Sequence, residues 1–140
     1  MSSVSHVAGQ NTFHLEWCPK YRYVCFRKEQ ILNDCVAAIR AAAERNSIQI
    51  LHLSVMPDHV HAIVSLRASM SVSHALMCLK GASAHSLFLS HPNFRKLFRK
   101  GHFWSRGSFS RSIGDADLST VMRYVREDND PYQKSLSSFF

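Results

Sequence analysis

The sequence has few acidic residues and no long apolar run. Its 10 aspartates and glutamates are outnumbered by 17 lysines and arginines, so the formal net charge is +7. A small domain with that balance usually binds a polyanion, most often nucleic acid; the alternative is an enzyme whose positive surface serves only solubility. No apolar run approaches the roughly 18 residues that span a bilayer, and the polar start does not resemble a signal peptide. We therefore expect a cytoplasmic protein without a membrane partner.

The cysteines are too few and too scattered for a disulfide framework or a C-x-x-C metal site. We expect them to be small buried thiols in a reducing compartment: Cys18, Cys25, Cys35 and Cys78. The chain also lacks internal repeats and any Gly/Ser-rich linker. The 140 residues are enough to bury a core without such staples. We therefore expect a loose arm over residues 1–11 and one domain over residues 12–140.

Apolar periodicity predicts alternating strands and helices. The expected elements, in order, are a strand over 12–26 interrupted at Pro19, a helix over 28–46, strands over 49–55 and 59–66 joined by a turn, a helix from its N-cap Ser71 to 89, a strand over 102–111, and a helix from its cap Asp117 to Asn129. This β-α-β-β-α-β order with an added C-terminal helix predicts an α+β protein with a ferredoxin-like antiparallel sheet. The fold serves many functions and decides none of them.

Two histidines two residues apart lie within an apolar strand pattern, His59-Val60-His61. Side chains alternate along a strand, so both imidazoles project from one face. Together they can supply two ligands to a metal ion. The alternative is a half-exposed strand that carries two histidines by chance. Six other histidines are expected to be structural or surface groups: His6, His14, His52, His74, His85 and His91.

The last expected helix places a tyrosine and a carboxylate together. Leu118, Met122 and Val125 form the stripe expected to contact the core. Tyr124 and Asp128, four residues apart, share a face about 100° around the helix from that stripe. An interfacial tyrosine with a solvated aspartate is the alternative interpretation.

If this face lies on the histidine side of the sheet, His59, His61 and Asp128 form a metal site with two histidines and one carboxylate, and Tyr124 lies beside it. A divalent ion there would act as a Lewis acid on a phosphodiester. A phenol ionises near pH ~10 and needs such a metal or a base to become a nucleophile at neutral pH. A tyrosine that attacks phosphate stores the bond energy as phosphotyrosine, so the strand can be rejoined without ATP.

Taken together, these motifs resemble the single-tyrosine transposases of the simplest bacterial and archaeal insertion sequences. The matching segments, which follow the family's order from about residue 12 to 129, are Lys20-Tyr21-Arg22, the HUH motif in Met56-Pro57-Asp58-His59-Val60-His61, Leu79-Lys80-Gly81-Ala82-Ser83, Phe103-Trp104-Ser105-Arg106-Gly107, Ser112-Ile113-Gly114 and the late Tyr124. Each segment alone is a weak signal, whereas the ordered set is specific.

The resemblance implies a Mg²⁺- or Mn²⁺-dependent enzyme, without a nucleotide cofactor, that cleaves and rejoins single-stranded DNA with hairpin-forming element ends. His59 and His61 would be metal ligands, and Tyr124 would form a 5′-phosphotyrosine and release a 3′-hydroxyl. The family works as a homodimer, in many members with active sites shared between subunits. Its third ligand is usually a glutamine four residues after the tyrosine; Asp128 stands there instead, and its carboxylate also suits hard divalent ions.

A basic and aromatic stretch, 94–106, is expected to extend the DNA-binding surface, since cations contact phosphates and exposed aromatic rings stack on unpaired bases. The candidate DNA-binding residues are Lys20, Arg22, Lys80, Arg95, Lys96, Arg99, Lys100, Trp104, Arg106 and Arg111. The alternative is that the aromatic rings of this stretch belong to the core and its charges form a solvated face.

Three other functions fit parts of the pattern. One is an HUH-type nicking enzyme that serves replication, conjugation or a domesticated repeat element. Another is a non-catalytic nucleic-acid-binding module of the same fold, and a third is a metal-dependent hydrolase of small phosphates.

Overall fold

A computed structural model describes residues 11–127 of the chain. Its elements are β1 (Thr12–Trp17), the 3-10 helix η1 (Lys20–Arg22), α2 (Glu29–Arg45), β2 (Gln49–Met56), β3 (His59–Ser65), α3 (Val72–Ser90), α4 (Phe94–Leu97), β4 (Phe109–Ser112) and α5 (Asp115–Glu127). The strands form one antiparallel sheet in the order β2-β3-β1-β4. This confirms the predicted α+β architecture with an added C-terminal helix. Most of the predicted arm, and Asp128, lie outside the described residues.

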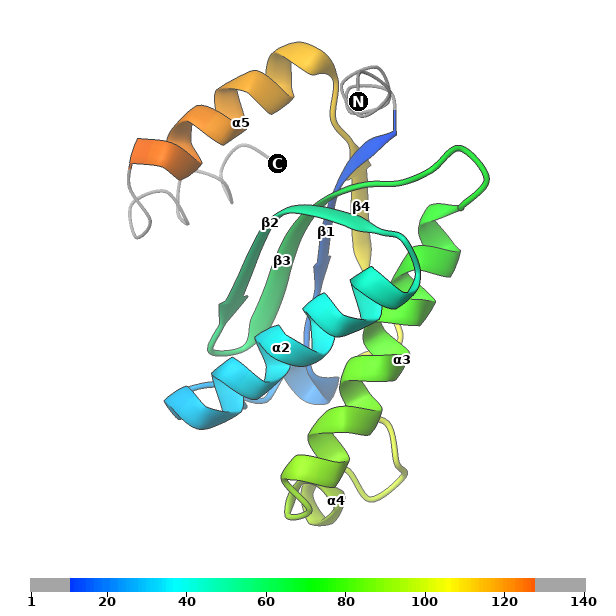
Figure 1. Ribbon diagram of the computed structural model, residues 1–140. Coiled ribbons are helices and arrows are strands. Elements are labelled where there is room, and N and C mark those ends of the chain that lie inside the picture. The colour runs from blue at the N-terminus through cyan, green and yellow to red at the C-terminus, as the bar shows by residue number, and fades with distance from the viewer. Residues whose placement is uncertain (1–10, 128–140) are drawn as a thin grey trace.

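The main core lies between one face of the sheet and the helices α2 and α3, which run next to each other over that face (Figure 1). Leu15 and Trp17 of β1 are buried in it, as are Val60 and Ala62 of β3. Ser71 caps α3 as predicted, because its side chain accepts a hydrogen bond from the His74 amide at 3.1 Å. Among the described helices, none is long and apolar enough to cross a membrane.

The opposite face of the sheet packs against α5. A second, smaller cluster joins Ile63 of β3 to Ile113 and Val121, with Leu51 and Leu118 at its edge. Figure 1 shows α5 well apart from α2 and α3. Because side chains on β3 alternate, His59 and His61 project from the same face as Ile63. The histidines and α5 therefore share one side of the sheet.

The predicted first strand is broken sooner than expected. β1 ends at Trp17, and Pro19 makes only an isolated bridge to Trp104. Proline cannot donate a ladder hydrogen bond, so the strand cannot continue through it. The turn that follows holds Tyr21 and Arg22 at φ values of 61° and 53°.

The prediction for the second strand was wrong in part. Leu51, Leu53 and Val55 were expected on one face, but the register shifts between Ile50 and His52. This bulge moves Leu51 to the cluster that contacts α5, while Leu53 and Val55 stay in the main core.

Two predicted boundaries near the C-terminal end also differ. The strand expected over 102–111 is limited to Phe109–Ser112, and the preceding loop is held by other contacts described below. The last helix begins at Asp115, because the Leu118 amide bonds to the Gly114 carbonyl at 2.9 Å, so Asp117 lies in its first turn rather than at its cap. Over residues 115–123, whose burial is described, Val121 is fully buried, whereas Met122 is only partly buried.

Candidate active site

The histidine pair, His59 and His61, lies on β3, which has a neighbouring strand on each side. His61 is opposite Ser54 on β2 and opposite Glu16 on β1. The tight turn before β3 places Asp58 next to His59 in sequence and in space. The pair is thus held by backbone ladders on both sides and flanked by two carboxylates.

Asp58 fixes the ring of His59. One Asp58 oxygen lies 2.7 Å from His59 Nδ1, and the other accepts a hydrogen bond from Arg22 Nε at 3.1 Å. An ionised carboxylate only accepts hydrogen bonds, so His59 Nδ1 carries the proton in this contact. The bonds from His59 and Arg22 keep the pKa of Asp58 below its usual value. His59 Nε2 is therefore directed away from the carboxylate.

His61 is packed against two groups from β1. Its Nδ1 lies 3.1 Å from His14 Nε2 and 3.5 Å from a Glu16 oxygen, and the His14 and His61 rings stack with centroids 5.3 Å apart. Burial lowers the pKa of His61 to about 3 and that of His14 to about 4. Both rings are therefore neutral at neutral pH. The nearby Glu16 carboxylate favours the proton on His61 Nδ1, which leaves a lone pair on Nε2.

The two Nε2 atoms of the histidine pair face each other at 3.0 Å. Two lone pairs at this distance repel unless a cation lies between them. The separation equals that of two neighbouring ligands each about 2.1 Å from an octahedral ion, for which the square geometry gives about 3.0 Å. His59 has the Asp58 carboxylate on its Nδ1, the arrangement that orients metal-binding histidines, whereas His61 Nδ1 contacts His14 Nε2 and has the Glu16 oxygen 3.5 Å away. The donor set therefore fits a divalent ion.

A second grouping is also compatible with a metal. His14, Glu16 and His61 each offer one ligand atom, and these atoms lie within 4.8 Å of one another. This grouping uses Nδ1 of His61, whereas the histidine pair uses Nε2. Glu16 has a role at either position. It would be a ligand in the second grouping, and it lies next to His61 Nδ1 when the histidine pair binds the ion.

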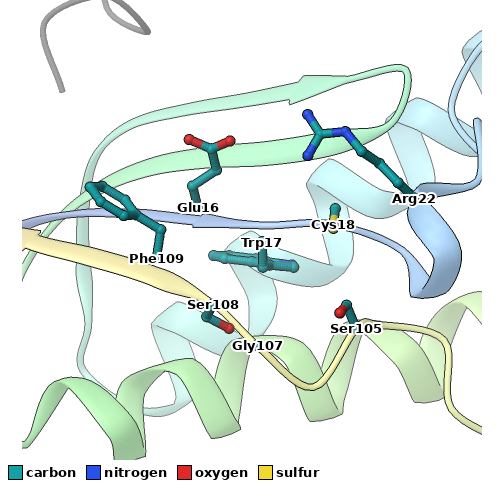
Figure 2. Close-up of a pocket in the computed structure, with 8 residues that line it drawn as sticks. All are labelled: Glu16, Trp17, Cys18, Arg22, Ser105, Gly107, Ser108 and Phe109. Carbon is teal, nitrogen blue, oxygen red and sulfur yellow. The ribbon is translucent and has the colours of Figure 1, made fainter.

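A cavity of about 500 Å³ opens beside these residues. Figure 2 shows Glu16 on β1 and Arg22 on the following turn η1, with Ser105 and Ser108 on the segment that runs along the other side of β1. Glu16 contacts His61, and Arg22 contacts Asp58. A ligand in this cavity would therefore lie against the residues that hold the histidine pair.

The predicted nucleophile is on the helix that packs against the histidine side of the sheet. Tyr124 lies within α5, three residues after the buried Val121. Its predicted partner Asp128 lies outside the described residues, so the third predicted ligand has no position here. The structure places the helix that carries Tyr124 on the histidine side of the sheet, and the predicted shared face of Tyr124 and Asp128 stays a prediction.

The predicted DNA-binding residues fall into two groups. Six of them are exposed: Arg95, Lys96, Arg99, Lys100, Arg106 and Arg111. The guanidinium carbon of Arg95 lies 4.4 Å from the centroid of the Phe88 ring. Arg22 is also exposed but bonded to Asp58, and Lys20 is half-buried with its ammonium group 5.8 Å from the centroid of the Tyr21 ring.

The second group serves the fold. Lys80 donates to the Ser105 carbonyl at 2.9 Å and to Ser108 Oγ at 2.8 Å, and it also reaches the Arg106 carbonyl at 3.4 Å. Desolvation lowers its pKa. Trp104 is buried, and its indole donates to Ser83 Oγ at 3.0 Å. Its ring belongs to the core and is not a stacking surface.

Sequence reasoning did not assign roles to Asp58, Glu16 or His14. His14 was expected to be a structural or surface group, and it is a buried structural one whose ring contacts His61. The available signal was the same period-two spacing that singled out the histidine pair, because His14 and Glu16 lie two residues apart on a neighbouring strand.

The comparisons with known proteins point to one family. Residues 8–128 match the family described as "Transposase IS200 like". The chain is 26% identical to the ISDra2 transposase TnpA of Deinococcus radiodurans over 121 residues, 86% of each chain. It is 29% identical to the transposase of insertion sequence element IS200 of Salmonella typhimurium over 125 residues, 89% of this chain and 80% of that protein.

Two solved structures share the fold. A transposase crystal structure from Deinococcus radiodurans superposes with a TM-score of 0.68 at 23% identity, covering 82% of this chain and 88% of the other. A REP-associated tyrosine transposase bound to a REP hairpin gives a TM-score of 0.55 at 15% identity, covering 83% and 66%. The family match spans most of the sequence, and the chain therefore belongs to the IS200-like transposase family.

Proposed function

We propose that this transposase cleaves and rejoins single-stranded DNA by a metal-dependent transesterification in which Tyr124 is the nucleophile. The observation that carries the proposal is the pair of facing Nε2 atoms, 3.0 Å apart, on the sheet face against which α5 packs. His59 and His61 would hold Mg²⁺ or Mn²⁺, with Asp128 as the third ligand. The ion would neutralise charge on the non-bridging phosphate oxygens.

The reaction exchanges one phosphate ester for another. The phenol of Tyr124 loses its proton to a base, its oxygen bonds to phosphorus, and the bond from phosphorus to the 3′ oxygen breaks. The departing 3′ oxygen takes up a proton, so the products are a 5′-phosphotyrosine and a 3′-hydroxyl. A second 3′-hydroxyl then attacks the phosphotyrosine and restores both the DNA strand and the free phenol, so no external energy source is needed.

The chain's own residues supply orientation. Asp58 and Glu16 hold the two imidazoles so that their Nε2 atoms converge. The cavity beside Glu16 has room for part of a DNA strand next to the metal site. The exposed cations of the basic stretch would hold the strand's phosphates and, with Lys20 and Arg22, extend the surface toward this cavity.

Two features of the assembly belong to the same proposal. The substrate would be single-stranded DNA whose element ends fold into hairpins; the REP-associated tyrosine transposase is the relative described as bound to a hairpin. The active unit would be a homodimer in which α5 of one subunit can complete the site of the other.

The test uses labelled single-stranded DNA carrying the element's ends, with Mn²⁺ or with EDTA. Denaturing gels should show label on the protein with Mn²⁺ only, and Tyr124→Phe should abolish the adduct while keeping DNA binding. Tyr132→Phe is the matched control, because it removes another hydroxyl close in sequence and should leave the adduct intact. An adduct that persists in Tyr124→Phe would exclude Tyr124 as the nucleophile.

The metal ligands are tested in the same assay. His59→Ala and His61→Ala should lower Mn²⁺-dependent cleavage far more than DNA affinity. Equal losses of cleavage and binding would argue against a catalytic role for the histidine pair. Tight binding without any adduct would favour a binding module of the same fold.

A further inference from the structure

A second pocket, of about 330 Å³, lies where the turn after β1 meets the loop after α4. Its lining includes Lys20, Tyr21, Tyr23, Phe98, Lys100 and His102, and it shares no lining residue with the cavity beside Glu16. We call it the tyrosine pocket. None of its described lining residues is acidic, and its aromatic rings are not part of the histidine site.

Of the two tyrosine rings in the pocket, Tyr23 packs against the core and Tyr21 is exposed. Tyr23 packs on Phe98 with centroids 5.8 Å apart, and Phe98 is buried in the main core. Tyr21 lies 5.3 Å from Tyr23, with the ring planes inclined by 51°, and is 68% exposed. The exposed ring therefore offers a flat apolar surface on which another ring could stack.

The backbone beneath these rings is held in an unfavourable conformation. Tyr21 and Arg22 both have positive φ, a region that non-glycine residues rarely occupy. The turn is tied down by the Arg22 amide on the Pro19 carbonyl at 2.8 Å and by the Lys20 amide on the Phe103 carbonyl at 2.9 Å. Glycine or asparagine usually occupies such positions, so two larger side chains here carry a conformational cost of the kind that clusters at functional sites. Here this conformation directs Tyr21 outward and Arg22 toward Asp58.

Three cations line the same pocket as the exposed ring. The Lys20 ammonium group lies 5.8 Å from the centroid of the Tyr21 ring, and Arg99 and Lys100 are exposed lining residues. A stacking ring next to phosphate-binding cations is the combination that binds single-stranded nucleic acid. A neutral apolar peptide would cover the rings but leave these charges without a partner.

We propose that the tyrosine pocket binds one unpaired base of the DNA strand, stacked on the exposed ring of Tyr21, with Lys20 and Lys100 on the flanking phosphates. The inference rests on the proposed function only in taking single-stranded DNA as the ligand. The inference adds a contact to a base, whereas the cations of the basic surface would contact only the phosphates. A base in this pocket would also place the strand on the turn whose next residue, Arg22, contacts the active site.

The test measures binding in EDTA, where no cleavage occurs, with fluorescently labelled single-stranded DNA bearing the element's ends. Tyr21→Ala should raise the Kd about 5- to 150-fold, the range expected for loss of one base-stacking contact. Tyr21→Phe keeps the ring and should bind like the unaltered protein. Leu89→Ala is the matched control, since Leu89 is also an exposed large side chain, at 67%, and lies on α3 outside the tyrosine pocket.

A set of oligonucleotides with one abasic site at each successive position identifies the bound base. One position should weaken binding of the unaltered protein and of Tyr21→Phe, but cause little further loss in Tyr21→Ala. Lys100→Gln should instead weaken binding of intact and abasic DNA equally and lower the dependence of the affinity on salt.

The proposal is overturned if Tyr21→Ala binds the DNA as tightly as the unaltered protein does, or if the unaltered protein does not bind the DNA. It is also overturned if no abasic position weakens binding of the unaltered protein more than binding of Tyr21→Ala. Failure of the proposed function gives a different result. Without a Tyr124 adduct in Mn²⁺ but with base-dependent binding through Tyr21 in EDTA, the chemistry would be wrong and the tyrosine pocket would stand.

Discussion

Replacing Asp58 should weaken metal binding without unfolding the protein. Its carboxylate accepts a hydrogen bond from His59 Nδ1 at 2.7 Å and so keeps Nε2 directed at His61. Asp58→Asn keeps an acceptor oxygen but loses the negative charge that raises the basicity of the ring. Asp58→Ala loses both. Because Asp58 lies in an exposed turn and its side chain is 30% exposed, neither change opens a cavity in the core.

The size of the effect follows from the geometry. Loss of a carboxylate that orients a metal-binding histidine typically costs about 10- to 100-fold in metal affinity. That range corresponds to about 1.4–2.8 kcal/mol. Asp58→Asn should fall near the lower end, since its amide oxygen can still accept the His59 proton, and Asp58→Ala near the upper end.

Titration calorimetry with Mn²⁺ measures the change directly, in the Tyr124→Phe background so that no DNA adduct can form. Asp34→Asn is the matched control: Asp34 bonds to His91 Nε2, also at 2.7 Å, but joins α2 to the end of α3 away from the histidine pair. It should leave the Kd for Mn²⁺ unchanged. If Asp58→Ala binds Mn²⁺ as tightly as the unaltered protein while remaining folded, Asp58 does not orient a ligand and the assignment of His59 fails.

Three further predictions concern the supports of the site. Lys80→Met should cost about 1–3 kcal/mol in urea unfolding, because it removes a charged donor from the carbonyl groups of the loop before β4. Val121→Ala should cost about 1–3 kcal/mol by opening a cavity beneath α5 and should lower adduct formation more than Mn²⁺ affinity. His14→Phe should reduce acid destabilisation in EDTA by about 3 kcal/mol between pH ~6.5 and 4.

The sign of the last effect follows from the direction of the shift. Burial lowers the pKa of His14 from 6.5 to about 4. Between these two values the imidazole is protonated in the unfolded chain and neutral in the folded chain. The contribution of the neutral imidazole to the free energy of unfolding is present above pH ~6.5 and is lost as the pH falls toward 4. A phenylalanine takes up no proton in either state. An unchanged acid limb of the stability curve in His14→Phe would show that His14 is not held neutral by the fold.

Local patterns in the sequence were enough to predict most of the fold. The period of 3.6 in α2 and the period of two in β3 are properties of neighbouring residues, and both elements were placed to within a residue or two. The bulge at Leu51 was not predictable this way, because it depends on how β2 aligns with β3 and on α5 needing an apolar contact. The short β4 depends on Lys80, which lies 25 residues before the first carbonyl that it binds.

The site was predicted in part for the same reason. His59 and His61 are two residues apart, so one strand pattern revealed both. Glu16 and His14 reach His61 only because β1 pairs with β3 in a particular register, across 45 and 47 residues of sequence. Trp104 was misplaced on the surface because an aromatic ring among lysines and arginines has the same local pattern whether it faces DNA or the core.

The distribution of charge follows from what such an enzyme must bind. A net charge of +7 attracts DNA but opposes a divalent cation. Burial resolves this conflict at the centre of the site, because it keeps His61 and His14 uncharged at neutral pH, and Asp58 and Glu16 add negative charge beside the histidine pair. Two arginines act electrostatically on these imidazoles: Arg22 is bonded to Asp58 and so is partly neutralised, and Arg111 is exposed on β4 opposite His14. The cations that remain exposed lie on the surrounding surface, where phosphates can reach them without displacing a metal ion.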